Sequence, residues 1–233
     1  MGWEPWFPYQ FENDNNQLTG LDVDLMVAIV KQMGYELIVK KLAWKHQLRS
    51  IDLGNLDFSP GASKTPEREK FAYFSSPYRT ESVKMFIKKG VAKEYPFKKL
   101  SDLVGTKFKL GVTRDYYYGE DFKILNDDKE FQKRLRWSTN DGLNYKKIVN
   151  NAIDGCLADY FSALGTIKQE GYMDQIEIHP IKIYETDIHV MFSKISTSPK
   201  IVTAFNQALE EIKKNGIYDQ IVDKYLNKNS NPK

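Results

Sequence analysis

The chain alternates between helical and strand-like hydrophobic patterns, and this alternation restricts its fold more than any other feature of the sequence. The segment LDVDLMVAIVKQMG (residues 21–34) spaces apolar side chains four residues apart and ends in glycine, which predicts a helix with a glycine stop. A strand over 35–44, a helix over 45–55 and a strand from 56 are expected next. A second run is expected as helices at 101–105, 118–125 and 144–155 and strands at 107–112, 135–137 and 156–159. This order predicts two α/β units with mostly parallel sheets.

The C-terminal third changes character. Residues 175–194 form a long β-rich segment, after which Ser198 and Pro199 supply an N-cap and a first-turn proline for a helix over 200–216. A last helix is expected over 217–226, followed by a polar, frayed tail. Because these trailing helices need a sheet to cover, we expect the chain to return to its first unit, which would make that unit discontinuous.

Charge and cysteine content exclude several classes of protein. The chain has 34 Lys+Arg against 31 Asp+Glu, a net charge of +3, with both signs interleaved, so we expect no nucleic-acid partner. A single cysteine, Cys156, excludes a disulfide framework and a Cys-rich zinc site, and its apolar neighbours predict a buried thiol. No metal or cofactor is expected. The N-terminal stretch MGWEPWFPYQ lacks the basic and apolar regions of a leader, and we expect an export signal to have been removed.

The turn GASKTPER (residues 61–68) carries the clearest chemical signal. A short strand ends at its small residues, and ligands of open α/β sheets bind at that edge. Thr65 and Pro66 look like the cap and first position of a helical turn, whose free N–H groups favour an anion. Arg68 can bring its planar fork to the same point, and a carboxylate fits that fork. The alternative is an exposed arginine on a helix surface.

Four motifs in order resemble one known family. GLDVDLMVAIVKQMGYELIVKKLAW, GASKTPER with FSSPY, KLGVTRDYYYG and AIDGCLAD are similar to the family-3 extracellular solute-binding proteins, the polar amino-acid binding proteins of bacterial ABC importers. The resemblance implies a periplasmic-binding-protein-like α/β fold, with two lobes, a two-strand hinge and a ligand cleft between them. Lobe 1 would comprise 1–87 and 189–233, and lobe 2 would comprise 88–188. It also implies a periplasmic monomer that captures an amino acid by cleft closure and delivers it to a membrane permease.

The same resemblance assigns ligand-binding residues. The family's α-carboxylate clamp falls on Gly61 (a backbone contact), Ser63 (hydroxyl and N–H) and Arg68 (the bidentate partner). The ammonium-binding carboxylate of the second lobe falls on Asp159, which would also cap the helix that follows it. Because an amino acid is a zwitterion, a cation on one lobe and a carboxylate on the other would let the ligand itself close the cleft.

Aromatic walls are expected around the rest of the ligand, with core packing as the alternative for each ring. The candidate wall residues are Trp3, Trp6, Trp44, Tyr116 and Tyr117. Asp115 stands where much of the family has a glycine followed by small hydroxyl residues; it either turns outward or favours a basic amino acid. Glu4 lies one residue off the register of a second family carboxylate, and the strand that precedes Trp3 in the family is largely missing here.

Two other functions share this fold. One is an enzyme similar to cyclohexadienyl dehydratase, which places a carboxylic acid in the cleft. We expect no enzyme, because His46, His179 and His189 show no metal-ligand spacing and no Gly-x-Ser-x-Gly motif is present. The other is the ligand-sensing domain of a membrane receptor, which binds similar ligands but continues through a membrane helix. The sequence leaves the identity of the ligand open.

Overall fold

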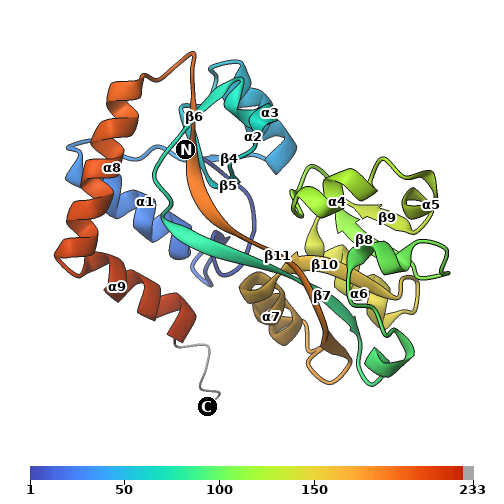
Figure 1. Cartoon of the computed structure of the whole chain (residues 1–233). Coiled ribbons are helices and arrows are strands. Elements are labelled where there is room, and N and C mark those ends of the chain that lie inside the picture. The colour runs from blue at the N-terminus through green and yellow to red at the C-terminus, as the bar shows by residue number, and fades with distance from the viewer. Residues whose placement is uncertain (228–233) are drawn as a thin grey trace. The chain divides into compact units, whose positions relative to one another are not determined.

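A computed structural model describes residues 1–227, so that 228–233 of the predicted tail lie outside the described residues (Figure 1). The chain divides into two compact units. Unit 1 comprises Met1–Thr80 and the chain from Asp187 onward, and unit 2 comprises Glu81–Thr186. The predicted lobe boundaries, after residues 87 and 188, fall within the same two strands as these divisions: β7 (Arg79–Lys88) and β11 (Ile176–Ser193).

Unit 1 is built from short strands, the C-terminal half of β11 and the longest helices of the described chain. Its other strands are β1 (Gly2–Trp3), β2 (Phe11–Glu12), β3 (Leu18–Thr19), β4 (Lys40–Lys41), β5 (Phe58–Ser63) and β6 (Ala72–Phe74). Its helices are α1 (Leu21–Gln32), α2 (Trp44–Asp52), α3 (Pro66–Glu69), α8 (Pro199–Lys214) and α9 (Ile217–Val222), followed by the π-helical turn η3 (Asp223–Asn227). Strands β5 and β6 both pair antiparallel with β11, whereas β1 pairs parallel with β4.

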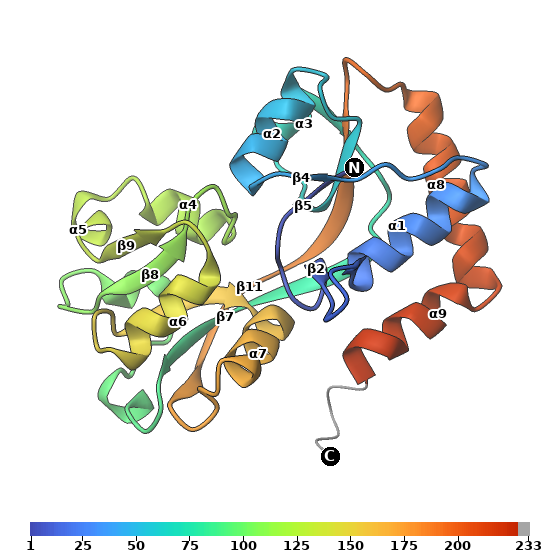
Figure 2. The ribbon, with the colours of Figure 1, turned by 180° about the vertical axis from the view of Figure 1, so that it is seen from behind.

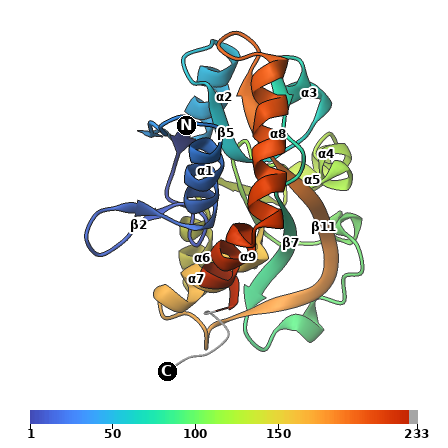
Figure 3. The ribbon, with the colours of Figure 1, turned by 90° about the vertical axis from the view of Figure 1, so that its left-hand side faces the viewer.

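The core of unit 1 joins segments from both ends of the chain. Helices α1 and α8 lie side by side and pack against one face of β11 (Figure 3). Ile29 of α1, Phe205 of α8 and Phe192 of β11 are all at most 1% exposed in this core. On the opposite face, Met191 of β11 packs with Ile51 of α2. Successive side chains of β11 point to opposite faces, so this one strand packs against α1 and α8 on one face and against α2 on the other.

Unit 2 has a five-strand sheet covered on both faces, to which β7 and the N-terminal part of β11 belong. Its elements are η1 (Ala92–Glu94), η2 (Leu100–Leu103), β8 (Leu110–Thr113), α4 (Glu120–Leu125), α5 (Lys129–Gln132), β9 (Leu135–Ser138), α6 (Asp141–Val149), β10 (Gly155–Asp159) and α7 (Tyr160–Gln169). The strands follow the order β11-β7-β10-β8-β9, in which β10, β8 and β9 are parallel and β7 is antiparallel to β10. Leu157 of β10 packs with α4 and α5, whereas its neighbour Cys156 packs with α6 and α7. The ribbon shows α4 and α6 on opposite sides of β8 (Figure 2). Cys156 is fully buried, as the sequence predicts.

Most predicted elements are confirmed, but some differ. The pairing predicted to be mostly parallel is antiparallel for β5 and β6 of unit 1, and the helix predicted over 144–155 is α6, which ends at Val149. The helix predicted over 21–34 is α1, with Gly34 at a φ of +80° just after its end. The strand predicted over 35–44 is wrong for most of its length, because only Lys40–Lys41 pairs, with β1, and Ile38 is 80% exposed. The helix predicted over 101–105 is the 3₁₀ turn η2. Within residues 1–227, no helix has both the length and the apolar character needed to cross a membrane.

Candidate functional site

The end of β5 and the short helix α3 bring three predicted site residues together in unit 1. Thr65 caps α3 by accepting a hydrogen bond from the Arg68 N–H at 3.3 Å, as the sequence predicts. The Arg68 Nη1 donates to the carbonyl oxygen of Ser63 at 2.9 Å. Its guanidinium carbon lies 5.3 Å from the centroid of the Trp44 ring, which is cation–π distance. The arginine is thus held on two sides, half-buried, with its charge beside Ser63.

Trp44 is itself fixed by a residue from the N-terminal segment. It opens helix α2, and the residue before it, Ala43, has no side chain that can cap the helix. Glu4 takes that role, because its Oε2 accepts a hydrogen bond from the Trp44 N–H at 2.8 Å. A carboxylate is favourable at a helix N-terminus. The proximity of Glu4 to the predicted site therefore has a structural cause that sequence reasoning did not find.

Gly61 occupies a backbone conformation that few other residues adopt. Its φ is +79°, and a Cβ atom placed on it would lie 3.0 Å from Cζ3 of Trp6. Its N–H already donates to the hydroxyl of Tyr78 at 3.0 Å. The backbone contact predicted for Gly61 can therefore use only its carbonyl oxygen, which suits a cationic group rather than a carboxylate.

Trp3 and Trp6 differ in their environments. Trp3 is 4% exposed and belongs to the core of unit 1, which is the alternative that the sequence left open. Trp6 is half-buried, and its ring lies over Gly61 and over the guanidinium of Arg79. The central carbon of that guanidinium lies 5.1 Å from the centroid of the Trp6 ring. Arg79 in turn forms a buried ion pair with Asp22. Sequence reasoning missed this pair, because no local pattern connects residues that lie 57 positions apart.

In unit 2, Asp159 stands at the carboxyl end of β10 and begins helix α7. Its Oδ1 accepts a hydrogen bond from the Ser162 N–H at 2.9 Å, so the predicted capping role is confirmed. Only 3% of the residue is exposed. A buried carboxylate at the end of a parallel strand lies where ligands of α/β sheets bind.

The tyrosine-rich loop after β8 is held by its own side chains. Asp115 has a φ of +65° and is exposed, which fits the outward alternative. The Tyr117 hydroxyl donates to Glu120 at 3.3 Å, and burial, followed by the charges nearby, raises the pKa of Tyr117 to about 12. Tyr118 is buried and its hydroxyl accepts a hydrogen bond from the Thr113 N–H at 2.7 Å. Tyr116 is partly buried against the adjacent core.

A buried polar network, which sequence reasoning missed, joins the carboxyl ends of β8 and β9 to helix α6. The Thr113 hydroxyl donates to the Asp141 carboxylate and accepts from Asn144 Nδ2 at 3.4 Å. Ser138 donates to Asn144 Oδ1 at 2.6 Å, and Lys147 donates to Ser138 at 2.6 Å. Thr113 and Asn144 are fully buried. Across residues 1–227, no group of three or more His, Cys, Asp or Glu side chains is arranged to hold a metal ion.

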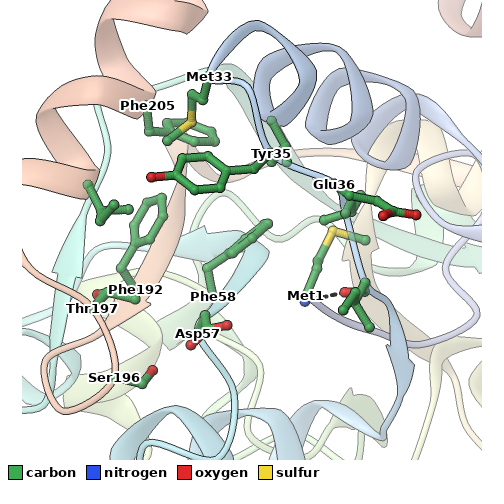
Figure 4. Close-up of a pocket in the computed structure, with 14 residues that line it drawn as sticks. Met1, Met33, Tyr35, Glu36, Asp57, Phe58, Phe192, Ser196, Thr197 and Phe205 are labelled. Atoms are coloured by element: carbon green, nitrogen blue, oxygen red, sulfur yellow. Dashed lines mark hydrogen bonds between the residues drawn. The ribbon is translucent and has the colours of Figure 1, made fainter.

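A separate pocket of about 320 Å³ lies in unit 1, between α1, α8 and the start of β5 (Figure 4). Phe58, Phe192 and Phe205 line it together with Asp57 and Glu36, and the Glu36 carboxylate points away from the three rings. Of the described residues that line it, none is a residue of the predicted clamp. The pocket adjoins the segment 36–38, which precedes the short strand β4.

Comparison with known proteins gives one family over the whole chain. The family model of the bacterial extracellular solute-binding proteins, family 3, matches residues 1–228. The L-cystine-binding protein TcyJ of Escherichia coli (strain K12) is 25% identical over 220 residues, 94% of this chain and 78% of that protein. The arginine-binding extracellular protein ArtP of Bacillus subtilis (strain 168) is 26% identical over 220 residues, 94% of this chain and 82% of that protein. The solved structure of an ancestral arginine-binding protein bound to arginine has a TM-score of 0.82 at 26% identity, covering 97% of this chain and 96% of that one.

Proposed function

Because this chain belongs to the bacterial extracellular solute-binding proteins of family 3, we propose that it captures an amino acid outside the cytoplasm and delivers it to the permease of an ABC importer. The protein acts as a monomer and as a binding protein, without catalysis. Relatives that bind cystine and arginine support an amino acid as the ligand class.

The observation that carries this proposal is the arrangement of Arg68. Its guanidinium is held between Ser63 and the face of Trp44, at the end of β5, on a turn that is capped by Thr65. A planar cation fixed in this way matches a carboxylate geometrically and loses little side-chain entropy when the ligand binds. We assign the ligand carboxylate to Arg68 and Ser63, with Trp44 and Trp6 as aromatic walls.

The ammonium end of the ligand is assigned to two acceptors. Asp159 of unit 2 supplies a buried negative charge, and Gly61 of unit 1 supplies a carbonyl oxygen, because its N–H is engaged by Tyr78. Tyr116 and Tyr117 of unit 2 are assigned to the same ligand as further aromatic walls. Charge-assisted hydrogen bonds shielded from water contribute about 1.5–3 kcal/mol each, so two to four of them must be joined by burial of the ligand against the aromatic walls to reach micromolar binding, about −8.2 kcal/mol, after the costs of association.

The first experiment is a thermal-shift screen of the twenty amino acids, polyamines and small carboxylates, followed by calorimetry with the best ligand. Arg68→Ala is expected to weaken binding about a hundredfold, because it removes a shielded, charge-assisted contact. Lys64→Ala is the matched control, since Lys64 is exposed, lies four residues away and pairs with Glu69 at 2.9 Å. Its removal should change the dissociation constant less than twofold.

Equal losses of affinity in the two variants would overturn the clamp assignment. A wild-type protein that binds none of the compounds would overturn the proposed function. Turnover of prephenate or arogenate by the purified protein would replace it with an enzymatic one.

A further inference from the structure

A buried ion pair lies beneath the proposed ligand wall of unit 1. Arg79 Nε lies 2.9 Å from Asp22 Oδ1, and Arg79 Nη2 lies 3.4 Å from Asp22 Oδ2. The side chains of these residues are 5% and 0% exposed, respectively. The bidentate geometry fixes the plane of the guanidinium relative to helix α1, which carries Asp22 in its first turn. At this depth the arginine is positioned to act on other side chains rather than on a ligand.

Three aromatic rings surround the guanidinium of Arg79. Its central carbon lies 3.8 Å from the ring centroid of Tyr9, 5.1 Å from that of Trp6 and 5.7 Å from that of Tyr78. Trp6 and Tyr9 also contact each other, with centroids 4.6 Å apart. A desolvated arginine attracts the face of an aromatic ring more strongly than an exposed one does. The orientation of Trp6 therefore depends on the plane in which Arg79 is held.

The same cluster reaches Gly61. The Tyr78 hydroxyl accepts the Gly61 N–H at 3.0 Å, and a Cβ atom on Gly61 would lie 3.6 Å from Asp22 Oδ2 and 3.0 Å from Trp6 Cζ3. Trp6 and the Gly61 backbone thus rest on one support made of Asp22, Arg79 and Tyr78. Burial, reinforced by the charge of Asp22, raises the pKa of Tyr78 well above its ordinary value, so its hydroxyl stays protonated.

We propose that Arg79, held by Asp22, is a positioning residue that sets the orientation of Trp6 and of the Gly61 peptide for ligand binding. This inference rests on the proposed function, because it takes Trp6 and Gly61 as parts of the site. A buried ion pair adds little net stability compared with well-packed apolar side chains. The geometry points instead to a specific requirement for a planar cation, since lysine cannot present a flat, bidentate group to both Asp22 and Trp6.

Two variants separate positioning from stability. Arg79→Lys keeps the charge next to Asp22 but loses the planar group, and the double variant Asp22→Leu/Arg79→Met removes both charges together and avoids an unpaired one. The probe is whichever of L-arginine, L-histidine and L-cystine the wild type binds most tightly. We expect the affinity of both variants for this probe to fall about tenfold. The fluorescence of Trp6 is isolated by subtracting the spectra of matched Trp6→Phe variants. We expect its quenching by acrylamide to rise about twofold, because the ring is no longer held against the planar cation.

Lys41→Met is the matched control. Lys41 lies 4.7 Å from the ring centroid of Trp3, so this variant also removes a cation from a tryptophan of unit 1. Lys41 is exposed, however, and outside the proposed site. It should leave both the affinity and the quenching of Trp6 unchanged.

Folded variants with wild-type affinity and wild-type Trp6 quenching would overturn the positioning role, even if their thermal midpoints fell. If Arg68→Ala abolished binding while both Arg79 variants bound normally, the proposed function would stand and this inference would fail. If wild type bound none of the three probes, Trp6 quenching alone would decide, since it needs no ligand: a rise in both variants supports positioning, and no change refutes it.

Discussion

Asp159 is assigned two tasks that depend on different properties of its side chain. As the cap of α7, it needs only an oxygen that accepts the Ser162 N–H, at 2.9 Å. As the proposed partner of a ligand ammonium, it needs a negative charge. Asparagine caps helices about as well as aspartate does but carries no charge. One substitution therefore separates the two tasks.

Asp159→Asn is expected to weaken binding of the identified amino acid at least about tenfold, because it removes a buried charge from the proposed ammonium site. The thermal midpoint without ligand should stay within about 3 °C of wild type, since the cap is retained. Titration calorimetry measures the affinity, and differential scanning calorimetry measures the thermal midpoint.

Asp128→Asn is the control, because Asp128 caps α5 in the same unit by accepting the N–H groups of Glu130 and Phe131. It should leave affinity unchanged. A fall in the midpoint of Asp159→Asn as large as that caused by a core substitution would mean that the aspartate is structural.

Among the elements of unit 2, β8, β9 and α6 depend on polar contacts at their ends as well as on apolar packing. The Thr113 hydroxyl contacts both Asp141 and Asn144, and Asn144 also accepts from Ser138. Because Thr113 and Asn144 are fully buried, water cannot replace a lost partner in the folded state. Losing one hydroxyl therefore leaves two polar groups without a hydrogen bond that they had.

Thr113→Val tests this network, because valine nearly matches threonine in shape. We expect the free energy of unfolding to fall by about 2 kcal/mol, and the thermal midpoint to fall by about 4–8 °C. Thr203→Val is the control, since Thr203 lies on the exposed side of α8 and its hydroxyl donates only to the Pro199 carbonyl at 3.0 Å. Its effect should stay within about 0.5 kcal/mol. Similar losses in both variants would show that the network contributes nothing beyond an ordinary surface threonine.

Periodicity predicts long elements well and short paired strands poorly. Helix α1 was predictable because its apolar spacing and its glycine stop are local properties of the chain. The strand predicted over 35–44 is reduced to Lys40–Lys41, because a strand also needs a partner, and β1 pairs only with these two residues. Apolar composition alone could not reveal that Ile38 is 80% exposed.

The same distinction applies to the candidate site. Ser63, Thr65 and Arg68 lie within six residues, so their association could be inferred from a turn motif. The supporting residues come from distant positions: Glu4 reaches Trp44, and Asp22 reaches Arg79. Such pairs depend on how β1, α1 and β7 pack together, which no local pattern encodes. Supporting contacts of this kind are therefore the part of a site that requires a structure.

At the scale of the whole molecule, the two units differ in how the chain supplies their cores. Both cores of unit 2 are formed by residues from one continuous stretch, and their members lie between Val83 and Ile181. The main core of unit 1 combines α1 with residues from β11 and α8, such as Ile188 and Leu209, which come more than a hundred positions later. Unit 2 is thus complete within 81–186, whereas the first eighty residues lack half of their core.

This difference predicts how fragments of the chain behave. Residues 81–186, produced alone, should fold and unfold cooperatively, since about a hundred residues with a sheet covered on both faces is a common domain size. Residues 1–80 alone should remain unfolded, because α1 would expose the apolar face that it buries against α8 and β11. Circular dichroism during thermal denaturation distinguishes a sigmoidal transition from a gradual one.

Adding the segment 187–233 to residues 1–80 as a separate peptide should restore a transition, since it returns Ile188, Phe205 and Leu209 to the core. A cooperative transition for 1–80 by itself, or its absence for 81–186, would contradict the division of the chain into one continuous and one discontinuous unit.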